Sequence, residues 1–335
     1  MRCVAEEGTM NAARPSRRLH RRCALAAAGA SLLLLASCAT VPQRAPSEWL
    51  GVLPEHATLY ASFAVTGSAD LVKKALKDAG PGFQDVSSLL DMTKRLVCSV
   101  TIVKGSPASF SVVALGSYPS GVIGMRLGGN KDWKRASGPA GKYWQWNKAG
   151  IQMSIPNNGI LLAANGGIDG LLTRWTSPLP LTVPPDVASD MQNADLVLYM
   201  PELPGGLAAN AAQKGMRIPI QEVWMNAVKG KAGYDLFGTA NTGSEQEAKL
   251  LTLALRLGIV AWMRSQNVTD VAGRLKSITV TAIGVQVKLA GLHLSDDEII
   301  PLFLSLVKGL SPAEEAPAEE ISPTEATPDS SASAP

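Results

Sequence analysis

The chain has 335 residues, 46% of them hydrophobic and only 5% aromatic, with a formal net charge of +3. Such a chain can bury a substantial core, in one large domain or two smaller ones. Six arginines and two glutamates lie in residues 1–37, and the remainder has 25 basic and 26 acidic residues. A chain without net basic charge lacks the electrostatic field of a nucleic-acid-binding protein, so we predict no nucleic-acid partner.

The N-terminus has the three zones of a secretory signal peptide. Five arginines between Arg14 and Arg22 form a basic zone, an apolar zone runs from Cys23 to Leu35, and the sequence Leu-Ala-Ser-Cys ends at Cys38. These four residues resemble the bacterial lipobox, whose cysteine is diacylated and becomes the first residue of the mature protein. We predict a lipoprotein signal peptide at 1–37, a diacylglyceryl anchor on Cys38 and a lipidated tether at 38–48. A plain signal peptide or an N-terminal membrane helix is the alternative, although the apolar zone is shorter than the ~20 residues of a span.

The C-terminal segment 311–335 is rich in Pro, Ala, Glu and Ser, with six acidic residues and no Lys or Arg. It cannot bury enough apolar surface to offset its ordering entropy, so we predict a disordered acidic tail. The folded α/β domain is then 49–310. A division into halves, 49–176 and 186–310, is left open. The segment "ADLVLYMPEL" after the Pro-rich stretch weakly repeats the pattern of "ATLYASFAV" near the start.

The pattern of apolar residues predicts the fold class. Alternation predicts a strand at 56–65, and a run of strands between 97 and 165 is punctuated by Gly, Pro and Asn, as antiparallel turns are. Residues 121–127, "GVIGMRL", are predicted as one of these strands. The later part mixes hairpins with a helix at 244–266. We therefore predict an α+β fold, an α/β/α layered domain with a mainly antiparallel sheet and several amphipathic helices.

Motifs of catalysis are absent from the sequence. Without the signal peptide the chain has two histidines, His56 and His293, and neither has a zinc-ligand neighbour at the usual spacing. No G-x-S-x-G nucleophile motif occurs. Cys98 lies in the apolar run "LVCSVTIV" and is predicted to be a small buried side chain. We predict a non-enzymatic protein with no catalytic residue, no metal and no cofactor.

The helix predicted at 244–266 is apolar around most of its circumference. It begins with a capping box, Ser244 and Glu247, and its polar residues form one narrow stripe. A helix that faces one core needs an apolar stripe of only about 100°. Three interpretations remain open: a helix packed between a sheet and another helix, a helix lining a lipid cavity, or a helix that lies in a membrane interface.

Two amphipathic helices, 244–266 and 295–308, are the candidates for contact with membrane lipids, and the helix at 68–79 contributes a basic face. The alternative function is a periplasmic carrier that holds a hydrophobic ligand in a closed apolar cavity. The predicted lipid-contact residues are Leu253, Leu257, Val260, Trp262, Leu302, Phe303 and Leu306.

An ordered set of short motifs resembles the treponemal outer-membrane-associated lipoprotein family. The resemblance implies an α/β/α fold with amphipathic helices, anchoring in the periplasmic leaflet of the outer membrane, lipid contact through the helices and raised membrane permeability, without enzymatic activity. It covers roughly residues 57–200 and continues weakly to about 305. The matching residues are Leu59-Tyr60, Leu71, Gly116-Ser117-Tyr118-Pro119, Asp132-Trp133, Tyr143, Ser154-Ile155-Pro156 and Leu198-Tyr199.

Overall fold

The computed structural model describes most of the predicted folded region. All described residues lie in one compact unit, 44–335, whereas the other unit is 1–43. The predicted signal peptide, the lipidation of Cys38, the tether at 38–48 and the acidic tail therefore lie outside the described residues and stay predictions. The described residues are 49–66, 68–69, 72–73, 87–103, 106–148, 150–180, 183–203, 219–265, 270–299 and 301–302.

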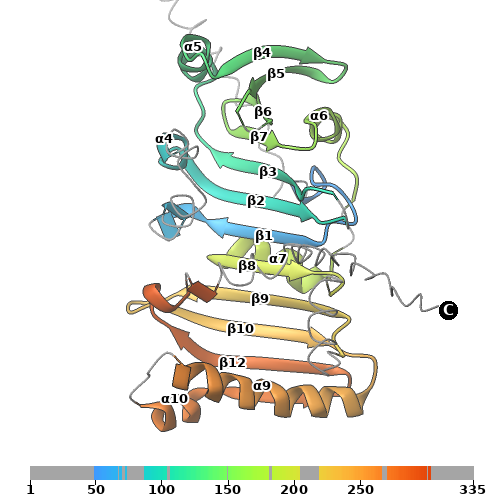
Figure 1. The fold of residues 1–335 in the computed structure, drawn as a ribbon, viewed down its shortest axis with the longest axis vertical. Helices are drawn as coiled ribbons and strands as arrows, with labels where there is room; N and C mark the ends of the chain where they lie inside the picture. Colours follow the sequence, from blue (N-terminus) through green and yellow to red (C-terminus); the bar gives the residue numbers. More distant parts are fainter. Residues whose placement is uncertain are drawn as a thin grey trace, which may run out of the picture. The chain divides into compact units, whose positions relative to one another are not determined.

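The described strands form a single 12-stranded sheet in the order β11-β12-β10-β9-β8-β1-β2-β3-β7-β6-β5-β4 (Figure 1). Every pairing of neighbours in it is antiparallel. The strands are β1 (Leu59–Ala64), β2 (Thr93–Thr101), β3 (Ser109–Gly116), β4 (Trp133–Gly138), β5 (Gly141–Trp146), β6 (Ile151–Asn157), β7 (Ile160–Ala164), β8 (Leu196–Met200), β9 (Glu222–Lys229), β10 (Tyr234–Asn241), β11 (Thr279–Ile283) and β12 (Gln286–Leu294).

The predicted α/β/α layering is wrong, because the structure is mostly one large sheet with few helices. Each new hairpin adds to the free edge that the previous strand leaves, so the apolar segments extend the sheet instead of forming helical layers. Among the described helices, only α9 is longer than ten residues. The helices are α4 (Ser87–Leu90), α5 (Ser120–Gly129), α6 (Asp169–Thr176), α7 (Pro185–Asn193), α9 (Glu245–Ser265) and α10 (Val271–Ser277).

The strand predicted at 121–127 is also wrong, because these residues lie in α5. Val122 and Ile123 are β-branched and favour strands, but this preference is easily overridden by packing. In the structure Ile123 is buried, and Leu127, one turn later, packs against the same cluster around Ala114 and Met153. Burial of this i, i+4 pair against the sheet stabilises the helix.

The centre of the sheet is the pair β1–β8. Tyr60 lies opposite Tyr199 and Phe63 opposite Leu196, and the two tyrosine rings stack with centroids 6.1 Å apart. Because side chains alternate along a strand, β1 supplies both faces. Tyr60 packs into the cluster that contains α6 and α7, whereas Ala61 packs into the cluster that contains the end of α9.

The two sides of this central pair repeat one order of strands. On one side the order is β1-β2-β3-β7-β6, and on the other it is β8-β9-β10-β12-β11, while β5 and β4 extend the first side alone. Equivalent loops make equivalent backbone bonds: Gly116 N donates to Gly159 O, and Thr242 N donates to Val285 O, each at 2.9 Å. The two donors, Gly116 and Thr242, are 126 residues apart in the chain, and so are the two acceptors, Gly159 and Val285. The described region therefore contains a structural duplication, with α5 and α9 in equivalent positions after β3 and β10.

Arg95 joins the centre of the sheet to α7. Its Nη1 atom donates to Ser62 Oγ at 2.8 Å and to the carbonyl oxygens of Met191 at 2.8 Å and Ala194 at 3.1 Å. Burial lowers the pKa of the guanidinium, and the charge of Asp195 opposes this effect. The cation thus satisfies carbonyl groups at the C-terminal end of α7, where positive charge is favourable.

Replacing Arg95 by Met keeps an apolar stem but removes these donors. We expect Arg95→Met to lower the free energy of unfolding by about 2–3 kcal/mol, because a buried carbonyl loses its charged donor. Neighbouring Lys94 is exposed, so Lys94→Met should change it by less than about 0.5 kcal/mol. Urea unfolding measures both, and equal values for the two variants would contradict the structural role of Arg95.

Candidate membrane-contact surface

The sequence of α9 fixes where this helix begins and how it is oriented electrostatically. Ser244 Oγ accepts a hydrogen bond from the backbone N–H of Glu247 at 3.2 Å, as an N-cap residue does. Glu245 and Glu247 lie in the first turn, and Arg264 lies in the last. Acidic residues at the N-terminus and a basic residue at the C-terminus interact favourably with the helix dipole and stabilise the helix. A helix with many apolar residues therefore still has a defined start and end.

One face of α9 packs on the sheet. Ala248 and Leu251 are buried in a cluster with Val280 of β11 and Val287 of β12, and Met263 is buried nearer the centre of the sheet. This face explains part of the apolar surface seen in the sequence. Through this face α9 is part of the folded core.

A second apolar face of α9 points away from the sheet. Leu250 is 58% exposed, Leu253 57% and Leu257 63%. Their spacing of i, i+3 and i+7 places them on one side of the helix. Ala254, Gly258 and Ala261 continue the same side and are also exposed. The helix therefore has two apolar faces, of which one is covered by the sheet and the other is exposed.

Arg256 lies between these faces and contacts the edge of the sheet. Its Nη2 atom donates to the carbonyl oxygen of Val280, on the edge strand β11, at 2.8 Å. An edge strand exposes unpaired backbone groups that invite association with other strands. Arg256 satisfies one such group, and it also separates the packed face from the exposed one.

The predicted contact residues fall into three groups. Leu253 and Leu257 lie on the exposed face. Val260 and Trp262 are half-buried, and Trp262 packs, together with Leu302, against the cluster at the centre of the sheet. Phe303 and Leu306 lie outside the described residues. Contact of any of these side chains with lipid stays a prediction.

Leu250 belongs to the exposed face but is missing from the predicted residues. Its spacing from Leu253 and Leu257 is a signal that the sequence contains. The sequence could not show which of the two apolar faces the sheet covers, because that depends on contacts with β11 and β12, which are distant in the chain.

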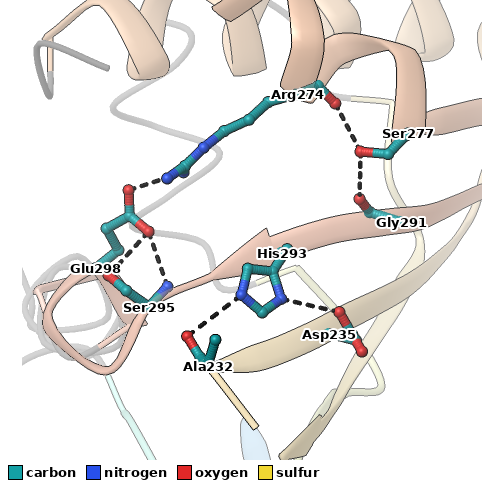
Figure 2. Close-up of polar contacts among 8 residues, drawn as sticks. All are labelled: Ala232, Asp235, Arg274, Ser277, Gly291, His293, Ser295 and Glu298. Atoms are coloured by element: carbon teal, nitrogen blue, oxygen red, sulfur yellow. Dashed lines mark hydrogen bonds and ion pairs between the residues drawn. The ribbon is translucent and has the colours of Figure 1, made fainter. Parts of the chain in front are cut away.

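Polar contacts hold α10 and the start of the last helix beside β12 (Figure 2). Glu298 Oε1 accepts from Arg274 Nη1 at 2.9 Å, and Glu298 Oε2 accepts from Ser295 N at 2.8 Å. Partial burial alone would raise the pKa of Glu298, but the hydrogen bonds from Ser295 and Arg274 together lower it. His293 and Asp235 pair across β12 and β10 at 3.0 Å. These groups bond to one another, which fits a structural role.

Metal-binding clusters, the one described cysteine and the length of the helices can be checked in the described residues. Over the described ranges, no three His, Cys, Asp or Glu side chains gather in a way that could hold a metal ion. Burial raises the pKa of the Cys98 thiol to about 12. No helix in the described part of the chain has the length and apolar character needed to cross a membrane.

The comparison with known families gives a match over the N-terminal part of the described region. The family model of outer membrane-associated lipoprotein TP0453 matches residues 44–202. The predicted family resemblance is confirmed. The matched segment runs from before β1 to just after β8. The description of the family supports a lipoprotein associated with the outer membrane.

Solved structures show the same fold over a longer range. Crystal form III of TP0453 has a TM-score of 0.57 at 15% identity, covering 76% of this chain and 97% of that one. Crystal form I has a TM-score of 0.57 at 15% identity, covering 79% and 98%. At this identity the likeness to TP0453 shows the fold alone. No curated protein matches the sequence.

The two faces of α9 predict two different responses to truncation. Leu251→Ala should lower the free energy of unfolding by about 2–4 kcal/mol, because it opens a cavity between α9 and the sheet. Leu257→Ala should change it by less than about 0.5 kcal/mol, because Leu257 is mostly exposed. Urea unfolding of both variants measures the difference. A similar loss for both would mean that protein covers the second face.

The buried thiol predicts slow chemistry at Cys98. A pKa of about 12 leaves roughly one thiol in ten thousand ionised at pH 8. We expect the folded protein, with Cys38 replaced by Ser, to resist a thiol-specific chromogenic reagent at that pH. The same protein in denaturant should react fully, which serves as the control. Fast reaction in the folded state would show that the region around β2 opens readily.

Proposed function

We propose that this protein is a non-enzymatic, lipid-anchored lipoprotein of the periplasmic leaflet of the outer membrane, and that α9 contacts the bilayer through its second apolar face. The observation that supports this most directly is the exposed row Leu250, Leu253 and Leu257. A soluble protein rarely leaves three aligned leucines exposed on one helix without a partner for them. The predicted anchor at Cys38 supplies a partner, because it holds the protein at a lipid surface.

The energetics favour contact in the plane of the membrane. Each leucine is already partly buried, so moving the remaining surface out of water is worth about 1–1.5 kcal/mol, or about 4 kcal/mol for the row. This corresponds to a partition constant on the order of 10³ M⁻¹, too weak to hold a free protein on a membrane. Two acyl chains give stable anchoring, and a tethered protein meets the bilayer at high effective concentration.

Contact through the second face requires no unfolding. Ala248 and Leu251 remain packed on the sheet while Leu253 and Leu257 meet lipid. Arg256, between the two faces, remains at the level of the polar headgroups, where its charge is tolerated. This geometry supports an α9 that lies along the surface of the membrane.

Flotation with phosphatidylcholine vesicles tests the proposal. The full mature chain carries Cys38→Ser, so that no acyl anchor contributes, and millimolar lipid reveals weak partition. We expect the double variant Leu253→Glu/Leu257→Glu to partition at least about tenfold more weakly, because two carboxylates would have to enter the apolar interface. Leakage of an enclosed dye gives a second readout, of permeability.

A matched control uses another exposed apolar pair. Val228 is 45% exposed and Phe237 41%, on the neighbouring strands β9 and β10. They alternate with Ala227 and Leu236, which pack on the α9 side, so they lie on the opposite face of the sheet. Val228→Glu/Phe237→Glu should float like the parent protein. Equal flotation of the α9 variant and the parent would exclude α9 as the contact. Lipid that co-purifies with a parent protein unable to float would instead indicate the hydrophobic-ligand carrier.

A further inference from the structure

The duplication assigns α5 the place in the first half that α9 has in the second. Ile123 N donates to Pro119 O and Ala248 N donates to Ser244 O, each at 3.0 Å, at the start of the two helices. The two donors are 125 residues apart in the chain, and so are the two acceptors. The clusters beneath them also correspond, since Ala114, Met153 and Leu161 hold the places of Ala240, Val280 and Val287. The two helices therefore pack on the same face of the sheet.

The correspondence extends to the exposed side of α5. The position that Leu250 has in α9 belongs to Met125 in α5, which is 76% exposed, and Val122, one turn earlier, is 49% exposed. Arg126 is also exposed, although the same offset gives it the place of Leu251, which is buried in α9. The exposed residues of α5 thus include two apolar side chains and a cation, whereas the exposed face of α9 is a row of leucines and small residues.

The region around α5 differs from α9 mainly in its charge. Between residues 92 and 168 the sequence has one acidic residue, Asp132, and Lys148 Nζ contacts its carboxylate at 2.7 Å. Residues 120–150 contain six basic residues, so this segment has a net charge of +5. All six are exposed: Arg126, Lys131, Lys134, Arg135, Lys142 and Lys148.

Strands β4 and β5 carry three of these six basic residues, Lys134, Arg135 and Lys142, and the described part of the second half has no counterpart of these strands. They lie beside α5. Trp133 and Trp146, directly paired across the two strands, stack with ring centroids 6.0 Å apart. The backbone of Gly128 in α5 lies against the ring of Trp144. The basic residues and the apolar side of α5 therefore form one unit, which we call the basic module (residues 120–150).

We infer that the basic module binds the anionic headgroups of phospholipids at the membrane surface. The inference rests on the proposed membrane association and adds the class of lipid. Outside the basic module and the acidic tail at 311–335, the mature chain has as many basic as acidic residues, so positive charge is concentrated in the basic module. Such a concentration complements an anionic bilayer, and each Lys or Arg held near such a surface strengthens binding several-fold. Val122 and Met125 enter the interface beside the headgroups, as apolar residues of interfacial helices do.

The positive charge of the basic module could serve two roles that involve no lipid, and each gives a different result with vesicles. Basic residues on an edge strand such as β4 can serve only to prevent strand association. The six acidic residues of 311–335 can also occupy the module from within the same chain. If the basic residues only prevent strand association, the protein will partition equally to anionic and neutral vesicles. If the acidic tail occupies the module, the protein will prefer anionic vesicles only after the acidic residues of the tail are removed.

Vesicle flotation separates these cases. The full mature chain with Cys38→Ser is compared on phosphatidylcholine vesicles and on vesicles that also contain phosphatidylglycerol, at low and high salt. We expect tighter partition to the anionic vesicles, lost at high salt. Arg135 and Lys142 share the face of the hairpin that carries Trp144, beside α5. Arg135→Gln/Lys142→Gln should weaken partition to the anionic vesicles about tenfold or more and leave partition to neutral vesicles unchanged. Lys231→Gln/Lys288→Gln, which removes two exposed charges from the other half, is the matched control.

Each outcome supports or overturns lipid binding by the basic module. Equal partition to both vesicles, with α9-dependent binding intact, overturns the basic module but keeps the proposed function. Absence of binding to either vesicle overturns both. A preference that appears only after the six acidic residues of 311–335 are replaced by Gln assigns the module to the tail instead of to lipid. A loss in the control variant equal to that of Arg135→Gln/Lys142→Gln shows that total charge, and not this surface, is responsible.

Discussion

The pairing of β1 with β8 is the contact on which the rest of the sheet depends. These strands are separated by about 130 residues, yet Tyr60 and Tyr199 lie opposite each other and stack. Without this pair the two halves would each end in an exposed, mostly apolar edge, and "LYASFA" and "LVLYM" would be prone to associate with other chains. Joined, they become the central strands of one sheet, and the free edges are then β4 and β11. Strand β4 carries basic residues, and β11 accepts a hydrogen bond from Arg256 of α9.

The duplication also explains why α9 has more apolar surface than a core helix needs. Its packed face is set by the sheet, since Ala248 lies where Ile123 lies in the first half. The exposed leucines are additional to that requirement. A helix that is held by one face and exposes the other can meet lipid without loss of its packing, so the stability of the fold and contact with a membrane do not compete at this site.

Some of this could be predicted from the sequence and some could not. The hairpins β9–β10 and β11–β12 and the start of α9 at Ser244 follow from local patterns of spacing and capping. The joining of all strands into one sheet does not, because it depends on pairings between distant segments such as β1 with β8. Residues 121–127 were misassigned because the packing of Ile123 and Leu127 on distant β3 and β6 decides their conformation.

The two halves use an almost equal length of chain in different ways. Between β3 and β6 the residues 117–150 form the short helix α5 and the basic hairpin β4–β5, whereas between β10 and β11 the residues 242–278 form the long helix α9 and α10. The first arrangement concentrates positive charge with little apolar surface, and the second concentrates apolar surface with little net charge. Because charge attracts over about 10 Å and apolar contact acts only at the interface, such a division would let one half orient the protein toward an anionic surface before the other half makes apolar contact.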